Sequence, residues 1–300
     1  RSVRAAKEEW KQLGRGKKNL TIALDWIHEH FNDAPLLGSL INPAKSDASR
    51  IVSWEELPET LNIALKKESD TAHQTDKSQQ SQEAAVVAQG MAKAAGMLAG
   101  KYQLVMTNVP YLKAGDQSEA LKKFCETNYP EAKYALETTF VERCHEFLSD
   151  VGCACVVTQQ YWLFLKYYES LRKKYIQTKG LGLIARLGPG AFESIGGEVV
   201  NVCLQITNNT TPVSHFGMDL DAFPTIEEKT DALKSLGLQQ ANQLAQLKNP
   251  DARISFELGG STGRPLSDFC DFGKGSVSGD GPHYLRKFWE IPENGMGRVY

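Results

Sequence analysis

Four consecutive residues, Asn108, Val109, Pro110 and Tyr111, bring together groups that could act on an aromatic amine. The exocyclic nitrogen of a base such as adenine is a poor nucleophile, because its lone pair is delocalised into the ring. Two acceptors aimed at its N–H groups, the Asn108 side-chain oxygen and the Val109 carbonyl, would free that lone pair. The Tyr111 ring would hold the base by stacking, once the base has been flipped out of a duplex.

The same residues also fit a purely structural interpretation. They follow the β-rich run "YQLVMT", so they could be a strand end and a proline turn. Asn108 would then cap the turn, and Tyr111 would be half-buried. The tetrapeptide alone favours this interpretation, so the choice depends on the elements around it.

Short apolar segments alternate with helical ones from residue 101 onward. "CACVVTQ", "LGLIARL" and "EVVNVCLQIT" are typical of strands, "YYESLRKKYIQT" is typical of a helix, and residues 118–148 predict two helices broken before Pro130. This alternation predicts an α/β fold, a Rossmann-like sheet with helices on both faces. Ligands of such sheets bind beyond the carboxyl ends of the strands, which is where Asn108 falls.

Residue composition distinguishes the regions before and after this alternating segment. Residues 1–100 predict helices and loops, including an Ala-rich helix that ends at Gly100. Beyond residue 212 the strand pattern is lost, which predicts a linker and the start of a further module over 213–300. The charges of "LRKKY", from Arg172 to Lys174, favour a solvated helix face.

Overall composition excludes several classes of protein. The chain of 300 residues is 41% hydrophobic and 23% charged with a formal net charge of −2, which argues against a sequence-blind basic binder. No apolar run approaches the length of a membrane span, so we expect no membrane partner. The six cysteines show no C-x-x-C spacing, which predicts reduced thiols in a cytoplasmic protein and no metal site.

An ordered series of blocks makes the chain recognisable. "YQLVMTNVPYL", "YALETTFVERCHEFL", "VVTQQYWLFLKYYESLRKKYI" and "LIARLGPGAFESIGGEVVNVCLQI" resemble the large adenine-specific DNA methyltransferases of bacterial restriction and phage-defence systems. The resemblance is to the BREX-type, or phage-growth-limitation, methylases. It covers roughly residues 20–210 and returns at "GSVSGDGPHYLRKFWEI". The family's Asn-Pro-Pro-Tyr catalytic motif falls on Asn108, Val109, Pro110 and Tyr111, with Val109 in place of the first proline; the substitution keeps the carbonyl and loses a fixed φ angle.

The resemblance implies further site residues. Gln160 and Trp162 follow the second strand and would lie at the same edge, near cofactor or base. Phe192, in the Gly-rich "GPGAF" loop, would pack against the flipped base or else be a core aromatic. Arg286 would meet a DNA phosphate or else belong to a charged surface turn.

The resemblance also implies the cofactor S-adenosylmethionine and double-stranded DNA as partner, with other subunits of a defence complex. The family's Gly-rich cofactor turn has no match before Asn108. We therefore expect the cofactor-binding residues to lie upstream of Arg1, and the chain to be an internal fragment that is inactive alone. Residues 101–212 would form the C-terminal half of the catalytic domain, and the start of a DNA-recognition region would follow them.

Two rival functions remain. One is a catalytically degenerate methylase fold that binds DNA or partner subunits, which Val109 and the missing turn motivate. The other, more distant, is a hydrolase, because "GGSTG" at 259–263 fits the G-x-S-x-G pattern without the strand and helix that the pattern requires.

Overall fold

The structure is a computed structural model, and it describes residues 18–71, 79–191, 200–210, 213–256 and 269–270. The chain divides into two compact units, residues 1–258 and 259–300. Phe192, Arg286 and the "GGSTG" motif lie outside the described residues. All of the regular structure below belongs to the first unit.

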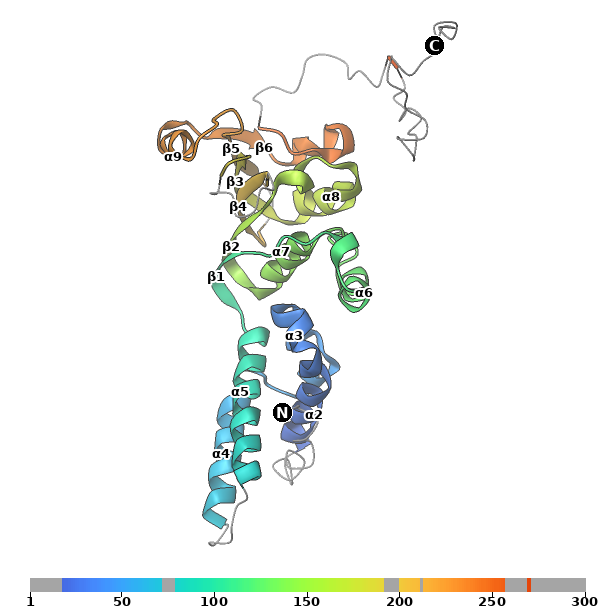
Figure 1. Cartoon of the computed structure of the whole chain (residues 1–300), viewed down its shortest axis with the longest axis vertical. Coiled ribbons are helices and arrows are strands. Elements are labelled where there is room, and N and C mark those ends of the chain that lie inside the picture. Colours follow the sequence, from blue (N-terminus) through green and yellow to red (C-terminus); the bar gives the residue numbers. More distant parts are fainter. Residues whose placement is uncertain (1–17, 72–78, 192–199, 211–212, 257–268, 271–300) are drawn as a thin grey trace, which may run out of the picture. The chain divides into compact units, whose positions relative to one another are not determined.

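Helices make up the N-terminal part of this unit, as predicted (Figure 1). They are α2 (Lys18–His30), α3 (Ala34–Leu37), α4 (Leu57–Thr71) and α5 (Gln79–Ala99), joined by the short 3-10 helices η2 (Phe31–Asp33), η3 (Gly38–Leu40), η4 (Pro43–Lys45) and η5 (Asp47–Arg50). Ala88, Ala92 and Ala95 recur at helical spacing on α5 and are fully buried. Gly96 continues this face, where an added Cβ would lie 2.9 Å from the carbonyl oxygen of Trp54. Small residues on α5 thus allow it to pack closely against the segment before α4.

The remainder is an α/β sheet with its helices. The helices are α6 (Glu119–Asn128), α7 (Leu136–Phe147), α8 (Glu169–Thr178) and α9 (Ile226–Ser235), with the 3-10 helices η6 (Ala114–Asp116), η7 (Gln160–Leu163), η8 (Lys166–Tyr168), η9 (Leu244–Lys248) and η10 (Pro250–Ala252). The strands are β1 (Tyr102–Asn108), β2 (Leu148–Gln159), β3 (Gly180–Gly188), β4 (Val202–Asn208), β5 (Ser214–Asp219) and β6 (Gln239–Asn242). The predicted break before Pro130 is the gap between α6 and α7.

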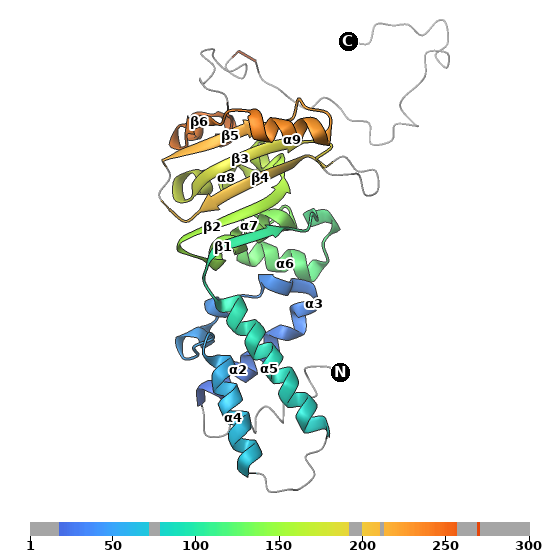
Figure 2. The ribbon, with the colours of Figure 1, turned by 90° about the vertical axis from the view of Figure 1, so that its left-hand side faces the viewer.

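The six strands lie in the order β1-β2-β4-β3-β5-β6 (Figure 2). β1 runs parallel to β2 and β3 parallel to β5, whereas β4 is antiparallel to both of its neighbours. β5, α9 and β6 lie beyond residue 212, so the sheet extends past the boundary that we expected there.

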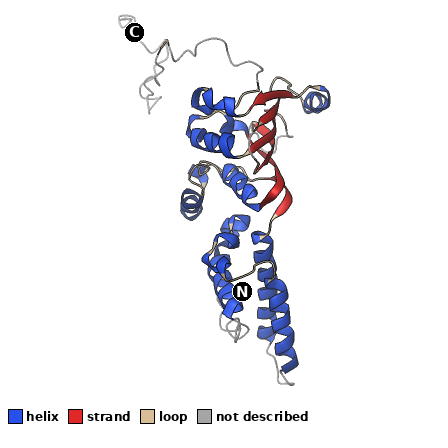
Figure 3. Ribbon diagram, turned by 180° about the vertical axis from the view of Figure 1, so that it is seen from behind, coloured by secondary structure: helices blue, strands red, loops and turns tan. Residues whose placement is uncertain are grey.

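Helices cover the two faces of the sheet unequally (Figure 3). Ile184 of β3 packs into the core that contains residues of α7 and α8. Its neighbour Ala185 points to the opposite face and packs with Ala232 of α9. Among the described helices, α9 is the one on this second face, and it covers the part over β3 and β5. Helices therefore lie on both faces, as predicted, with the second face only partly covered.

An apolar row crosses the uncovered part of the second face. Strand register places Met106, Cys155, Ile206, Leu183 and Phe216 side by side on five neighbouring strands. Met106 is 72% exposed, Ile206 38% and Phe216 37%. Alternation of side chains fixes this placement, because Ala154, next to Cys155, belongs to the core on the other face.

A buried arginine joins the N-terminal helices to α7. Arg143 donates hydrogen bonds to the carbonyl oxygens of Ser39 (2.8 Å), Ile41 (3.0 Å) and Leu98 (2.6 Å). The same guanidinium pairs with Glu146 at 3.2 Å, so its charge is compensated although the side chain is 2% exposed. The helical region before β1 is thereby hydrogen-bonded to α7, a helix that packs on the sheet.

Candidate active site

The predicted site around Asn108 lies at the carboxyl edge of the sheet. Strand register places Asn108 opposite Val157 near the end of β2, and Gln159 and Gly188 both opposite Val202, the first residue of β4. The ends of β1, β2 and β3 and the start of β4 therefore meet at one edge (Figure 2). This is the edge at which open α/β sheets bind ligands.

Asn108 and Tyr111 lie side by side at that edge. Asn108 is exposed at the end of β1, and the Tyr111 hydroxyl donates a hydrogen bond of 3.2 Å to its Oδ1. Tyr111 is half-buried, and this burial, with smaller effects of Cys203 and Glu137, raises its pKa to about 12. The phenol is therefore protonated at neutral pH and acts as a donor to Asn108.

Val109, which replaces the family's proline, has a structural role as well. Its side chain is buried in the core on the α7 and α8 face, at 4% exposure, while Pro110 is exposed. Apolar packing of Val109 thus anchors the turn where a proline ring would have restricted φ. The position retains its backbone carbonyl.

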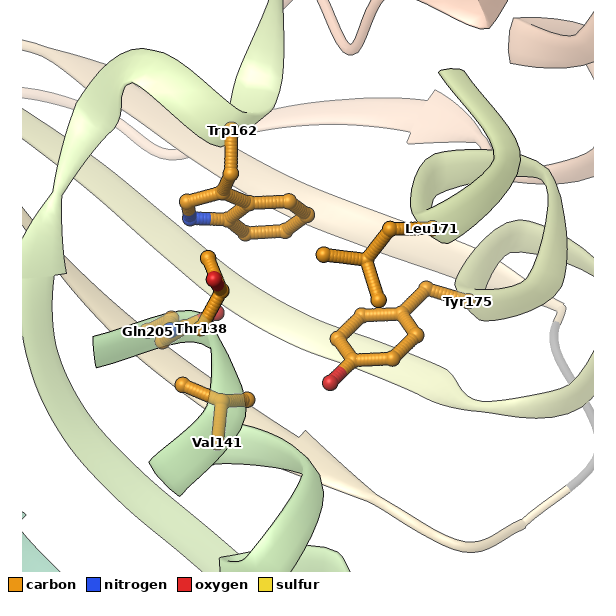
Figure 4. Close-up of a pocket in the computed structure, with 6 residues that line it drawn as sticks. All are labelled: Thr138, Val141, Trp162, Leu171, Tyr175 and Gln205. Carbon is orange, nitrogen blue, oxygen red and sulfur yellow. The ribbon is translucent and has the colours of Figure 1, made fainter. Parts of the chain in front are cut away.

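Gln160 and Trp162 follow β2 but differ from the expectation. The backbone N–H of Gln160 donates to the Asn201 carbonyl at 2.9 Å, and its side-chain Oε1 is buried without a partner. Trp162 is 2% exposed and points into the core. There it lines a narrow gap in the core, too small to hold a water molecule, together with Thr138, Val141, Leu171, Tyr175 and Gln205 (Figure 4). A side chain enclosed in this way does not reach the edge, so we leave Trp162 out of the proposed site.

The space beside the Gly-rich turn after β3 is filled by another side chain of the same chain. Gly188 and Gly190 have φ of 66° and 71°, in the left-handed region that favours glycine. A Cβ on Gly188 would lie 2.0 Å from Oδ1 of Asp221. Because the chain's own carboxylate fills the space beside Gly188, this turn does not fit the role of a cofactor cradle.

Sequence reasoning missed several polar groups near this edge. Arg186 pairs with Asp219 at 2.8 Å and with Asp221 at 3.5 Å, and buried Lys229 donates to the carbonyl oxygens of Leu187 and Leu220. The signal that was available is the pair of aspartates Asp219 and Asp221 at the end of β5. Glu137, the second residue of α7, was also missed, because a glutamate in the first turn of a helix resembles an ordinary N-terminal charge.

The described ranges contain neither a metal-binding cluster nor a membrane-spanning helix. Within them, no group of three or more His, Cys, Asp or Glu side chains is placed to hold a metal ion. No helix in those ranges has both the length and the apolar character needed to cross a membrane. The six cysteines are free thiols.

An α/β sheet with an Asn-x-Pro-Tyr turn at its carboxyl edge has the character of a methylase catalytic domain, as the block resemblance implied. A model of the Eco57I restriction-modification methylase family matches residues 19–189, more than half of the chain. The chain belongs to this family.

Two curated relatives carry adenine-specific names. The adenine-specific methyltransferase BrxX of Escherichia coli O9:H4 (strain HS) is 30% identical over 179 residues, a match covering 60% of this chain and 14% of the relative. The adenine-specific methyltransferase PglX of Lacticaseibacillus casei (strain Zhang) is 36% identical over 103 residues, covering 34% of this chain and 8% of the relative. The chain thus matches a small part of the length of these relatives.

Likeness to solved structures is weaker. A nuclease-deletion mutant of the Type ISP restriction-modification enzyme LlaGI, in complex with a DNA substrate mimic, is 12% identical with a TM-score of 0.42, over 79% of this chain and 26% of that one. The DrdV–DNA complex is 13% identical with a TM-score of 0.40, over 52% of this chain and 19% of that one. Likeness at this level supports no comparison of residues.

Proposed function

We propose that this chain is a catalytic segment of an S-adenosylmethionine-dependent DNA adenine-N6 methyltransferase from a bacterial restriction-modification or phage-defence system. One observation carries the proposal. In a member of the Eco57I methylase family, an exposed Asn108 ends a strand at the ligand-binding edge of the sheet, with Tyr111 bonded to it. The adenine-specific names of BrxX and PglX support the choice of base.

The chain's own residues would bind and orient the target amine. The Asn108 side-chain oxygen and the Val109 carbonyl accept its two N–H groups, which frees the nitrogen lone pair for attack. Tyr111 stacks on the flipped adenine, and its hydroxyl must leave Asn108 Oδ1 when the amine arrives. Gln160, with a buried and unpartnered Oε1 close to the same edge, is retained as a candidate contact to substrate.

The cofactor would supply the methyl group. Among the described residues we assign no side chain to the cofactor, because the space beside the Gly-rich turn at Gly188 is filled by Asp221. Phe192 and Arg286, both outside the described residues, stay proposed contacts to the base and to phosphate. Double-stranded DNA and other subunits of a defence complex are the proposed partners, in the cytoplasm.

The experiment is transfer of labelled methyl from S-adenosylmethionine to double-stranded DNA by the full-length protein with its partner subunits. We expect label on adenine N6 and a loss of at least about a hundredfold in the Asn108→Ala variant, because a preorganised acceptor is removed. Asn128→Ala is the matched control, since Asn128 is exposed and bonds only to the carbonyl of Phe124 among the contacts described. Unchanged transfer by Asn108→Ala would refute the site. No transfer by any variant would favour the degenerate binding module instead.

A further inference from the structure

The chain that leaves the Asn108–Tyr111 turn is paired with the segment that leads into α7. The backbone N–H of Ala114 donates to the carbonyl oxygen of Tyr134 at 3.0 Å, and Lys113 forms an antiparallel bridge with Ala135. These main-chain contacts begin directly after the turn and Leu112. The position of Tyr134 is therefore fixed relative to the candidate catalytic turn.

Tyr134 belongs to a cluster of three tyrosines. Its ring centroid lies 4.9 Å from that of Tyr167 and 5.6 Å from that of Tyr168, and the last two centroids are 4.6 Å apart. Tyr168 is 3% exposed and packs in the core, whereas Tyr134 is 37% and Tyr167 48% exposed. A buried ring thus supports two exposed ones. Rings held at the surface in this way offer a large contact area to a partner at little cost in conformational entropy.

Three lysines lie next to the exposed rings. Lys133 directly precedes Tyr134, with its Nζ 5.8 Å from the centre of that ring, and Lys166 directly precedes Tyr167. Lys113 lies on the segment that is paired with Tyr134, and both Lys113 and Lys166 are exposed. Among the described residues, no carboxylate lies within ion-pair distance of any of the three ammonium groups. Unpaired positive charge is therefore gathered here, in a chain with a formal net charge of −2.

We call Lys113, Lys133, Tyr134, Lys166 and Tyr167 the tyrosine–lysine patch. Lysine ammonium groups and tyrosine hydroxyls are both donors to the phosphate oxygens of DNA. An acidic protein surface would attract the lysines too. The patch, however, is bonded to the turn that receives the adenine under the proposed function, and the strand that carries this adenine passes close to the turn. The location therefore favours DNA as the partner.

We propose that the tyrosine–lysine patch binds the sugar–phosphate backbone of the DNA strand that carries the target adenine, next to the flipped nucleotide. Its lysines neutralise phosphates, and its two phenol groups donate to phosphate oxygens while their rings cover the neighbouring sugar. Contacts of this kind hold a duplex in register and carry no sequence information. The inference rests on the proposed function and deepens it, because it names the surface on which the substrate lies.

The test measures binding of the full-length protein, with its partner subunits, to mixed-sequence double-stranded DNA at several salt concentrations. Each lysine that neutralises a phosphate contributes about 0.9 to the magnitude of the slope of log K against the logarithm of the salt concentration. Lys113→Gln, Lys133→Gln and Lys166→Gln combined should therefore reduce that magnitude by about 2 to 3.

A matched triple substitution removes the same charge elsewhere. Lys66→Gln, Lys93→Gln and Lys248→Gln replace exposed lysines of α4, α5 and η9. We expect this control to change the slope by less than about 0.5, because charges that do not contact phosphate are screened by salt. Equal reductions in the two triple variants would overturn the proposal, since net charge alone would then explain the effect.

Substitution of the tyrosines separates their contribution from that of the lysines. Tyr134→Leu with Tyr167→Leu keeps apolar packing on Tyr168 and removes both phenol groups. The affinity for the same DNA should fall about tenfold with the slope unchanged, because donors to charged groups are lost and no charge is removed. Unchanged affinity in this variant would overturn the role of the tyrosines.

Binding and methyl transfer fail in distinguishable ways. If wild type binds DNA but transfers no methyl to adenine, the proposed function fails, while a reduced slope in the patch variant still supports the surface. If wild type methylates adenine and the patch variant keeps the wild-type slope, the proposed function stands and the surface proposal fails. Loss of a partner subunit from the patch variant, with the slope retained, would make the patch a protein interface and also overturn the proposal.

Discussion

The Tyr111 hydroxyl and Asn108 Oδ1 are hydrogen-bonded to each other at 3.2 Å in the structure without substrate. Oδ1 is the acceptor that the proposed reaction needs for the adenine amine. A substrate would therefore replace an existing hydrogen bond, and the phenol would have to turn away or donate elsewhere. Burial keeps the phenol protonated, so it does not leave by ionising at neutral pH.

Substitutions of Tyr111 separate its ring from its hydroxyl. Tyr111→Phe keeps the stacking surface and leaves Asn108 free, so we expect kcat/KM within about threefold of wild type. Tyr111→Ala removes the ring, and the expected loss is about tenfold to a hundredfold, as for one lost base–aromatic stack. Steady-state methyl transfer by the full-length protein measures both. A large loss in Tyr111→Phe would show that the hydroxyl itself takes part in the reaction.

Arg143→Met should uncouple the N-terminal helices from α7. Three carbonyl oxygens lose a charged donor, and Glu146 loses one of its partners while it keeps Lys45, at a cost of about 3–5 kcal/mol. The free energy of opening, measured by hydrogen exchange at the α7 amides, should fall by that amount. Arg50→Met is the control, since the Arg50 side chain is 82% exposed and the change should stay within about 0.5 kcal/mol. Equal effects of the two substitutions would contradict this role.

Arg172 and its neighbour Lys173 should differ greatly in their contribution to stability. Arg172 is fully buried and donates to the carbonyl oxygens of Trp162, Leu165 and Asp251. Arg172→Met should lower the free energy of opening by about 3–5 kcal/mol and speed amide exchange in residues 160–165, because these carbonyls lose a charged donor. Lys173 pairs on the surface with Glu169, so Lys173→Met should change stability by less than about 1 kcal/mol.

Because His145 is buried, we expect the free energy of unfolding to fall in mild acid. Burial, and to a lesser degree Lys179 and Lys174, lowers its pKa from 6.5 to about 3, against the effect of its bond to Asn209. The folded state thus binds fewer protons than the unfolded state between these values. The contribution of His145 to stability is present above pH 6.5 and is lost as pH falls toward 3, by about 1.4 kcal/mol per pH unit.

The variant His145→Asn isolates that contribution. It should be less stable at pH 8, because the hydrogen bonds to Asn209 and Thr207 are lost, but its stability should fall less steeply below pH 6.5. Denaturation midpoints measured from pH 8 to pH 4 would give both slopes. Parallel slopes for variant and wild type would rule out His145 as the titrating group.

Local patterns sufficed for most of the sheet. β1, β2, β3 and β4 and helices α5 to α8 fall where apolar runs, Gly100 and Pro130 indicated them. Register could not be read in this way, because the antiparallel insertion of β4 between β2 and β3 depends on contacts distant in sequence. β6 was missed because "QQAN" has little β character, and pairing with β5 determines its conformation.

The candidate site was predicted in part. Asn108 and Tyr111 were found because a short motif carries their chemistry, and the structure places them together. The prediction of a solvated helix face for Arg172 to Lys174 is wrong for Arg172, whose partners are backbone carbonyl oxygens. Every residue has such an oxygen, so the sequence does not show which ones accept from a buried arginine. Burial of single side chains could not be predicted either. Glu137 is of a residue type usually found at the surface but is buried, and Trp162 was expected at the edge of the sheet but is buried in the core.

The exposed row from Met106 to Phe216 has a consequence for handling the protein. A flat apolar strip with a free strand edge at β1 favours attachment of one molecule to another. Light scattered per unit of protein concentration should rise as solutions of the isolated chain become more concentrated, and the substitutions Met106→Lys and Ile206→Lys should suppress that rise without changing the far-ultraviolet circular dichroism. Low recovery of the separate segment would then reflect adhesion between folded molecules and not a failure to fold.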